Sequence, residues 1–221
     1  MTKEGKTLAG RVLVTSGPTR AYFDRIRYIA NTSSGALGKI IVETLAAEGF
    51  DVVHIYGAGS MHCDEKFADR VEAIEIETVD DLIDAVHKFC KSEEIQAVVH
   101  AMAVLDYQPE TRLTEKKKSG GDNWSLNLVK TPKVTPIIRE LVPDARFIGF
   151  KLESNVSEDE LINRAYQSLQ SYGLDAVLAN DLDKVTAESH EAVIIGKDGG
   201  IMGRAGTKAE IANLVRDIIS K

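Results

Sequence analysis

Apolar residues recur along the chain in two patterns that alternate almost to its end. Short apolar or alternating runs are typical of strands, and they cover residues 12–15, 51–56, 71–76, 95–103, 124–129, 147–152, 176–179, 192–195 and 200–204. Apolar residues spaced three or four apart are typical of one helix face, and they cover residues 34–48, 79–91, 157–172 and 208–219 and a further segment that begins at 130–132. This alternation predicts a single α/β domain over residues 1–221.

The character of individual strands predicts their places in a sheet. Residues 95–103 form a nearly uninterrupted apolar run, which is typical of a central parallel strand covered on both faces. Residues 71–76 alternate apolar and acidic side chains, as a strand near a sheet edge does. Residues 192–195 and 200–204 flank a turn-forming Lys-Asp-Gly and are expected to pair antiparallel. We therefore predict a Rossmann-like three-layer fold in which a mostly parallel, doubly wound sheet has an antiparallel extension.

Two local signals refine the helices. Ser157 is followed by Glu160, which has the form of a capping box at the start of the helix over 157–172. Pro132 is expected in the first turn of the helix that begins at 130–132, where a missing N–H is tolerated.

A long polar segment separates the first strand from the first helix, where about 2–6 residues are usual. It carries Gly17, Arg20, Arg25, Arg27 and Asn31. Its place at the carboxyl end of a first strand favours a phosphate or carboxylate site, with solvated surface arginines as the alternative. Asn31 is suited to hydrogen-bond a carbonyl oxygen on which negative charge develops, with a plain turn role as the alternative.

The helix that follows opens at Ser34, Gly35 and Ala36. Backbone N–H groups at a helix N-terminus point at an anion, and Gly35 allows close approach because it has no Cβ. The alternative is that Thr32 or Ser33 merely caps the helix, which leaves the length of the polar segment unexplained.

A second polar segment covers residues 104–123, and the run 124–129 is its candidate hairpin partner. Lys116, Lys117 and Lys118 make part of it a basic loop, which suits a triphosphate or a pyrophosphate leaving group; a solvated charge run is the alternative. Asp106 follows the central strand and is placed to meet a ribose hydroxyl or a hydrated cation, with a turn carboxylate as the alternative.

Several classes of function are disfavoured by what the sequence lacks. The net charge of −7 argues against nonspecific nucleic-acid binding, and no apolar run reaches the roughly 18 residues that span a bilayer. Neither the two cysteines, Cys63 and Cys90, nor the histidines have the spacing of metal ligands. The cysteines are expected to be free thiols in a reducing compartment. Glycines after the first strand do not form the G-x-G-x-x-G turn of nicotinamide enzymes.

The ordered motifs resemble those of the phosphopantothenate–cysteine ligase (phosphopantothenoylcysteine synthetase) family of coenzyme A biosynthesis. They read GRVLVTSGPTR, DRIRYIANTSSGALG, AVLDY, EKKK, GFKLES and LAND, and the resemblance runs over about residues 10 to 215. Because the sequence starts almost at the ligase's first strand, it resembles the stand-alone bacterial form, without the flavin-dependent half.

The resemblance implies an amide-forming reaction in two steps. The carboxylate of 4′-phosphopantothenate attacks the α-phosphate of a nucleoside triphosphate, and the amine of L-cysteine then displaces the nucleotide. The family implies CTP, or less commonly ATP, as co-substrate, together with Mg²⁺. It also implies a cytoplasmic homodimer in which a neighbour helps to complete each site.

The resemblance also assigns roles to residues. Asn31, Arg27 and Lys116 correspond to the catalytic set, with Lys116 in a flexible loop that closes over the site. Substrate or phosphate binding falls to Ser34, Gly35, Ala36, Met102 and Ala103. Nucleotide binding falls to Gly17, Asp106, Pro132, Lys133, Val134, Thr135 and Phe150. No residue is assigned as a protein ligand of a metal. One departure is that residues 164–172 contain no lysine, whereas fused bacterial members carry lysines there that reach the triphosphate.

Two other functions compete with the ligase. One is an NAD(P)-binding reductase of a dinucleotide-fold family, and the other is a non-catalytic nucleotide-binding protein. The choice between CTP and ATP, the dimer geometry, closure of the loop over 116–118 and the anion at residues 34–36 are left open by the sequence.

Overall fold

The computed structural model describes residues 11–92, 94–121, 123–186 and 188–221. Its main sheet has eight strands in the order β12-β11-β10-β9-β6-β1-β4-β5. Their bounds are β1 Arg11–Ser16, β4 Val52–Gly57, β5 Val71–Ile76, β6 Ile95–His100, β9 Arg146–Glu153, β10 Ala176–Asp181, β11 Ala192–Gly196 and β12 Ile201–Ala205. The pairs from β5 to β10 are parallel, whereas β11 pairs antiparallel with both β10 and β12. The predicted sheet, with its antiparallel extension, is confirmed.

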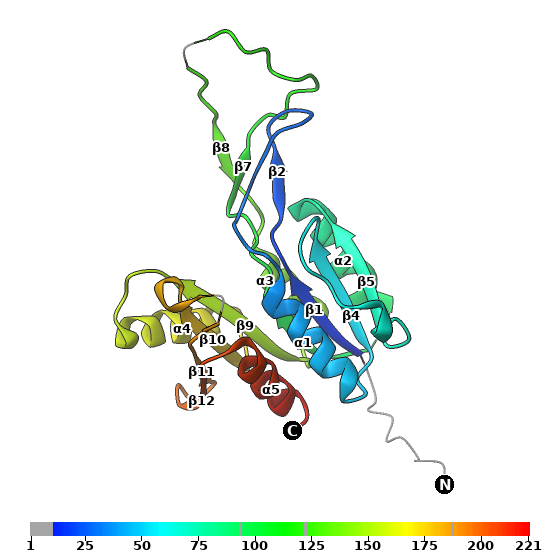
Figure 1. Cartoon of the computed structure of the whole chain (residues 1–221), viewed down its shortest axis with the longest axis vertical. Helices are drawn as coiled ribbons and strands as arrows, with labels where there is room; N and C mark the ends of the chain where they lie inside the picture. Colours follow the sequence, from blue (N-terminus) through cyan, green and yellow to red (C-terminus); the bar gives the residue numbers. More distant parts are fainter. Residues whose placement is uncertain (1–10, 93, 122, 187) are drawn as a thin grey trace.

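Helices cover both faces of this sheet (Figure 1). On one face lie α1 (Ala36–Ala47) and α5 (Lys208–Ile219), which pack against each other. On the other lie α2 (Val79–Ser92), α3 (Val134–Leu141) and α4 (Glu158–Tyr172). The three-layer arrangement follows the predicted order of strands and helices.

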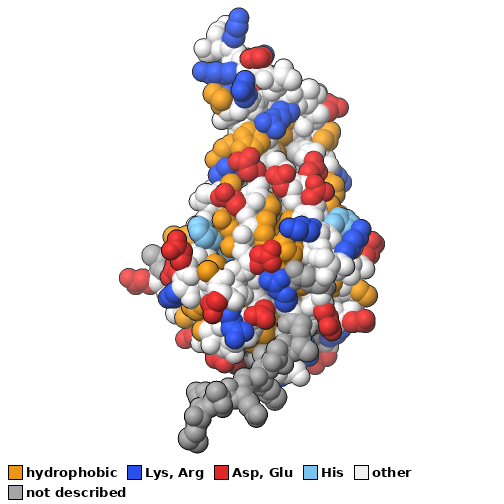
Figure 2. All heavy atoms as spheres, turned by 90° about the vertical axis from the view of Figure 1, so that its right-hand side faces the viewer, with side chains coloured by type: hydrophobic (Ala, Val, Ile, Leu, Met, Phe, Trp, Pro, Cys, Tyr) orange, Lys and Arg blue, Asp and Glu red, His pale blue; other side chains and the backbone are white. Residues whose placement is uncertain are grey.

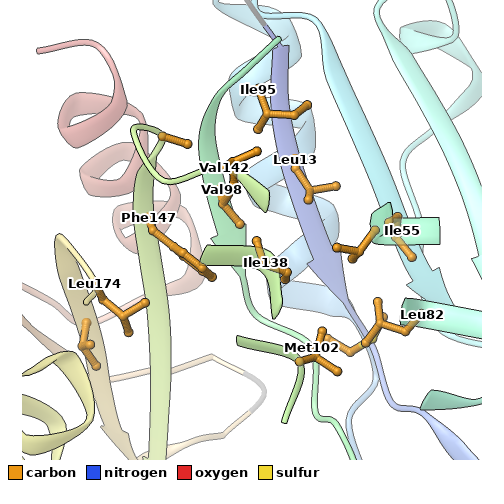
Figure 3. Packing of buried hydrophobic residues seen from close by; sticks show 14 of the residues in the cluster. Leu13, Ile55, Leu82, Ile95, Val98, Met102, Ile138, Val142, Phe147 and Leu174 are labelled. Carbon is orange, nitrogen blue, oxygen red and sulfur yellow. The ribbon is translucent and has the colours of Figure 1, made fainter. Parts of the chain in front are cut away.

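The alternation of side chains along β1 divides the core into two halves. Leu13 contributes to the cluster beneath α2, α3 and α4, which includes Leu82, Ile138 and Phe147 (Figure 3). Its neighbours Val12 and Val14 contribute to the cluster beneath α1 and α5. A strand that is apolar on both faces is buried on both, as the runs over β1 and β6 indicate.

Two short hairpins project from the carboxyl edge of the sheet (Figure 1). One pairs β2 (Arg20–Tyr22) with β3 (Tyr28–Ala30), and the other pairs β7 (Tyr107–Pro109) with β8 (Leu128–Lys130). Because β2 lies against β7, the hairpins form one structure, which we call the arm (residues 20–30 and 107–130). The β2–β3 hairpin is absent from the sequence prediction, since strands of three residues are too short for alternation to show.

Three predicted boundaries are wrong, and each error has a tertiary cause. The strand over 95–103 ends at His100, because the next residues bond to the segment after β1. The hairpin partner is residues 128–130 rather than 124–129. Since Thr131 is then held by a bond from its N–H to the Asp106 carbonyl (3.0 Å), α3 begins at Val134 and Pro132 precedes the helix.

The capping prediction is half right. Ser157 Oγ accepts from the Glu160 N–H (3.3 Å), but the Glu160 carboxylate bonds to Arg164. The complete capping box is formed instead by Thr207 and Glu210 at the start of α5.

Candidate functional site

Three glycines from two stretches of the chain meet where β1 ends and α1 begins. Gly17 and Gly35 have φ of 74° and 76°, and a Cβ on either would lie within 3.0 Å of the Ser60 hydroxyl oxygen. A Cβ on Gly38 would lie 2.1 Å from Ser16 Cβ. The fold therefore brings together three features that the sequence does not show as one glycine motif. They are a tight turn at Gly17, a helix start at Gly35 and a close helix–strand contact at Gly38.

The N-terminus of α1 has no side chain as its N-cap. Gly35 is the N-cap residue, so capping by Thr32 or Ser33 is wrong. Ser34 holds the turn, because its carbonyl accepts from the Met61 N–H (2.9 Å) and its Oγ lies 3.4 Å from the Ala36 nitrogen. The first turn of α1 contains no acidic residue, so its N–H groups and dipole favour an anion there.

The loop after β1 is joined to the loop after β6. The Ala103 N–H donates to the Gly17 carbonyl (2.9 Å), and the Leu105 N–H donates to Thr19 Oγ1 (3.0 Å). Asn31 belongs to the same assembly, since its Nδ2 donates to the carbonyls of Ala103 (3.1 Å) and Val104 (3.4 Å). Within the described residues the amide oxygen of Asn31 has no hydrogen-bond partner.

A cleft of about 230 Å³ opens beside this assembly, between β6, β9, α3 and α4. Most of the residues that the sequence assigns to the nucleotide line it, and so does one assigned to substrate: Met102, Asp106, Pro132, Lys133, Val134, Thr135 and Phe150. Lys133 Nζ lies 2.5 Å from an Asp106 carboxylate oxygen, and this hydrogen bond raises the pKa of Lys133. Most of the predicted nucleotide set thus lines one cleft. Gly17 does not line it, but its carbonyl accepts from the Ala103 N–H beside it.

Sequence reasoning missed part of the cleft lining. Lys151, Ser168, Tyr172 and His100 all contribute to it. His100 could have been noticed as the polar residue in the apolar run 95–103. Its Nδ1 lies 2.6 Å from Thr15 Oγ1, and burial lowers its pKa to about 4, so the imidazole is neutral at pH 7.

A second buried histidine holds the other side of the β1 end. His54 Nε2 lies 2.8 Å from Ser16 Oγ, and burial lowers the pKa of His54 to about 4. Because Thr15 and Ser16 point to opposite faces of the sheet, neutral imidazoles from β6 and β4 fix the last residues of β1 from both sides.

Arg27 and Lys116 lie apart from this assembly. The Arg27 guanidinium donates to the Asp24 carboxylate and, at 3.0 Å, to the Lys117 carbonyl, all within the arm. Lys116 lies in the same arm, next to Lys117. In this structure the Arg27 guanidinium is therefore paired with Asp24, and its assignment to the catalytic set stays a prediction.

Neither cysteine is activated. Cys63 and Cys90 are free thiols, and burial raises the pKa of both, that of Cys90 to about 11. Among the described residues no group of three His, Cys, Asp or Glu side chains could hold a metal ion. The described helices include none that is long and apolar enough to cross a membrane.

Residues 8–221 match the family of the DNA/pantothenate metabolism flavoprotein C-terminal domain. The chain belongs to this family. The solved DNA/pantothenate metabolism flavoprotein from Streptococcus pneumoniae superposes with a TM-score of 0.87 at 32% identity, covering 96% of this chain and 99% of that one. The predicted family resemblance is thereby confirmed.

Curated relatives are named coenzyme A biosynthesis bifunctional protein CoaBC. That of Thermococcus kodakarensis is 38% identical over 217 residues, which is 98% of this chain and 52% of the relative. That of Methanocaldococcus jannaschii is 30% identical over 220 residues, 99% of this chain and 51% of the relative. The chain thus spans about half the length of these relatives. A Cab2 variant in complex with phosphopantothenate-cysteine shares the fold, with a TM-score of 0.74 at 19% identity.

Proposed function

We propose that this chain joins 4′-phosphopantothenate to L-cysteine through an acyl-nucleotide intermediate, a step of coenzyme A biosynthesis. The observation that carries the proposal is the position of Asn31, whose amide is tied to Ala103 between the α1 N-terminus and the cleft. An anion-binding helix end, a carboxamide and an adjoining cleft for the nucleotide are the three parts that the reaction needs. Membership of a family whose curated relatives are coenzyme A biosynthesis proteins supports the same reaction.

The two steps place different demands on the site. In the first, a carboxylate oxygen of phosphopantothenate attacks the α-phosphorus, the α–β phosphoanhydride bond breaks and pyrophosphate leaves. In the second, the cysteine amine attacks the acyl carbon, loses a proton and expels the nucleoside monophosphate. Neither step uses a protein nucleophile, so catalysis rests on positioning and on charge stabilisation. We assign Asn31 to the acyl oxygen and Lys116 to the departing phosphates.

The proposed co-substrate is CTP, with ATP as the less favoured alternative. Its base and ribose occupy the cleft beside Phe150 and Asp106. The α4 residues that line the cleft are Ser168 and Tyr172, so the cations there are Lys133 and Lys151 rather than lysines of that helix. Each is paired with a carboxylate, Lys133 with Asp106 and Lys151 with Glu153 at 3.0 Å. Triphosphate binding would therefore exchange a carboxylate partner for a phosphate.

Mg²⁺ fits the cleft as an ion carried chiefly by the nucleotide. Asp106 is the carboxylate that lines it, and Mg²⁺ typically binds one or two protein carboxylates together with substrate phosphates and water. When bound, the ion neutralises phosphate charge.

We also propose that the chain is a cytoplasmic homodimer. The arm exposes large apolar side chains, and Figure 2 shows orange side chains lying among charged ones on it. The exposed large apolar side chains of the arm are Ile26, Tyr28, Tyr107, Leu113, Trp124, Leu126, Leu128 and Val129. Exposed apolar groups gathered on a projecting arm favour burial against a second copy. Light scattering coupled to size-exclusion chromatography measures the mass, and a monomer at micromolar concentration contradicts the dimer.

The test of the ligase is pyrophosphate release. The chain is supplied with phosphopantothenate, cysteine and Mg²⁺, and with CTP, ATP, GTP or UTP in turn. We expect release with CTP above the others, and amide product only when cysteine is present. Absence of pyrophosphate with every nucleotide contradicts the proposal, and oxidation of NADPH in a parallel reaction would favour the reductase instead.

A further inference from the structure

The arm is built around one buried carboxylate. Asp24 Oδ1 accepts from the backbone N–H groups of Ile26 (2.9 Å) and Arg27 (2.8 Å). Its Oδ2 accepts from Arg27 Nε (2.8 Å) and from the Lys117 N–H (3.1 Å), and a second Arg27 nitrogen also donates to it. The Asp24 side chain is fully buried although the arm is only two hairpins thick. A single carboxylate thus joins the β2–β3 turn to the middle of the lysine loop (residues 116–118).

Arg27 extends the same connection. Its guanidinium donates to the Lys117 carbonyl (3.0 Å) and lies over the Trp124 ring, 4.8 Å from the centroid. Trp124 in turn meets Phe23 edge to face at 5.1 Å, and the Leu113 N–H donates to the Phe23 carbonyl (3.1 Å). The β2–β3 turn therefore contacts the residues before, within and after the lysine loop. We call Asp24, Arg27, Trp124 and the backbone of Lys117 the clasp.

The energetics of a buried charge explain why the clasp holds. An unpaired carboxylate is costly to bury, whereas this one is neutralised by Arg27 and accepts a backbone N–H on Oδ1, from Ile26, and another on Oδ2, from Lys117. Arg27 holds the pKa of Asp24 well below its usual range, so the carboxylate is ionised throughout the physiological range. Within the described residues the Lys116 side chain has no hydrogen-bond or ion-pair partner. The backbone at Lys117 is therefore the point at which the loop is fixed.

We propose that Asp24 is a positioning residue of the ligase: through Arg27 and the Lys117 backbone, it sets where the lysine loop presents Lys116. The inference rests on the proposed function for the role of Lys116. It also gives Arg27 a different role from phosphate binding, because the guanidinium serves to join the loop to the β2–β3 turn. Release of the clasp should leave the Lys116 side chain chemically unchanged, but the side chain should then occupy many positions instead of one.

The test compares Asp24→Asn with Asp51→Asn in the full chain. Asp51 forms an exposed ion pair with Arg70 (3.1 Å) at the opposite edge of the sheet, so it is matched in chemistry and lies outside the arm. Trp124 is the only tryptophan of the chain, which makes its fluorescence a direct report on the clasp. Brief trypsin digestion at Arg112 and residues 116–118, read by mass spectrometry, reports release of the loop.

For Asp24→Asn we expect about tenfold faster cleavage in the loop, since cleavage follows the population of the open segment. Trp124 emission should shift to longer wavelength and become more accessible to acrylamide. With saturating nucleotide, kcat should fall about tenfold while the KM for phosphopantothenate changes less than about twofold. Asp51→Asn should match the wild type in every readout.

A second variant keeps the proposal testable if Asp24→Asn does not fold. Arg27→Lys retains the positive charge next to Asp24 but cannot bridge to the Lys117 carbonyl, and it should show the same changes at smaller size. Unchanged cleavage and Trp124 emission in both variants overturn the clasp. A released loop with unchanged kcat overturns the positioning role. A raised KM for phosphopantothenate in Arg27→Lys but not in Asp24→Asn also overturns it, because Arg27 would then bind the substrate directly. Cleavage and fluorescence do not depend on turnover, so failure of the clasp is distinguishable from failure of the ligase.

Discussion

The carboxyl edge of the sheet and the arm carry the two halves of the candidate site, and they are held in different ways. At the sheet edge, backbone bonds join Gly17 to Ala103, and buried histidines fix the end of β1. In the arm, the backbone is held by strands of three residues and by one buried ion pair, while large apolar side chains face solvent. The difference indicates a rigid platform at the sheet edge, beside the cleft proposed for the nucleotide, and an appendage whose order depends on few contacts.

The largest effect should come from the platform. Asn31→Ala removes the amide that we assign to the acyl oxygen, and we expect amide formation to slow by about 10²–10³-fold. Pyrophosphate release in the first turnover should persist, so the acyl-nucleotide accumulates and can be trapped by rapid quench. Asn213→Ala, on α5 and outside the cleft, is the control. An unchanged rate of amide formation would remove Asn31 from the mechanism.

Next in size is the arm itself. Lys116→Gln should lower kcat by about 10–10²-fold with an unchanged melting temperature, because the side chain is exposed and has no ion-pair partner among the described residues. Lys66→Gln, an exposed lysine outside the arm, is the matched control. Equal activity of the two variants contradicts a role for the lysine loop and leaves the platform as the whole site.

Stability of the platform gives a smaller effect. Gly38→Ala places a Cβ 2.1 Å from Ser16 Cβ, and we expect a loss of about 1–3 kcal/mol in the free energy of unfolding, measured in urea. The α1 N-terminus should shift with it, which weakens nucleotide or phosphate binding. Gly206→Ala, where the nearest atom is the flexible Glu210 carboxylate at 3.5 Å, is the control. Equal stability of the two variants means that β1 and α1 are not rigidly joined.

The effect that is smallest at neutral pH is a pH dependence, which grows only as the solution is acidified. Burial lowers the pKa of His54 and His100 to about 4, so the unfolded chain binds more protons than the folded one below about pH 6.5. Their contribution is complete above that pH and is lost as the pH falls toward 4. Each should cost up to about 1.4 kcal/mol of unfolding free energy per pH unit in this window. His54→Gln and His100→Gln should each flatten the slope, and an unaltered slope contradicts the linkage.

The sequence was sufficient to predict a helix or a strand where the spacing of its own apolar residues decides its secondary structure. The helix over 208–219 and the strand over 71–76 have the predicted bounds, because their inner faces are apolar at helical and at alternating spacing. The nucleotide set was also predictable as a group, because motif order places it at the carboxyl ends of neighbouring strands. The arm was not, since its strands gain their order from one another and from Asp24 rather than from a local period.

The sequence by itself determined the order of the helices and of the main-sheet strands, the two-faced core, the family and many of the residues that meet at the cleft. Only the tertiary structure decided that Gly17 lies close to the Gly35–Gly38 stretch and that His100 lines the cleft with the predicted nucleotide residues. It also decided that Arg27 pairs with Asp24 and bonds to the lysine loop. The physical reason is distance along the chain: Thr19 bonds to a residue 86 positions away and Asp24 to one 93 positions away. Contacts of that range leave no periodic trace, because either partner alone is an ordinary polar residue of a loop.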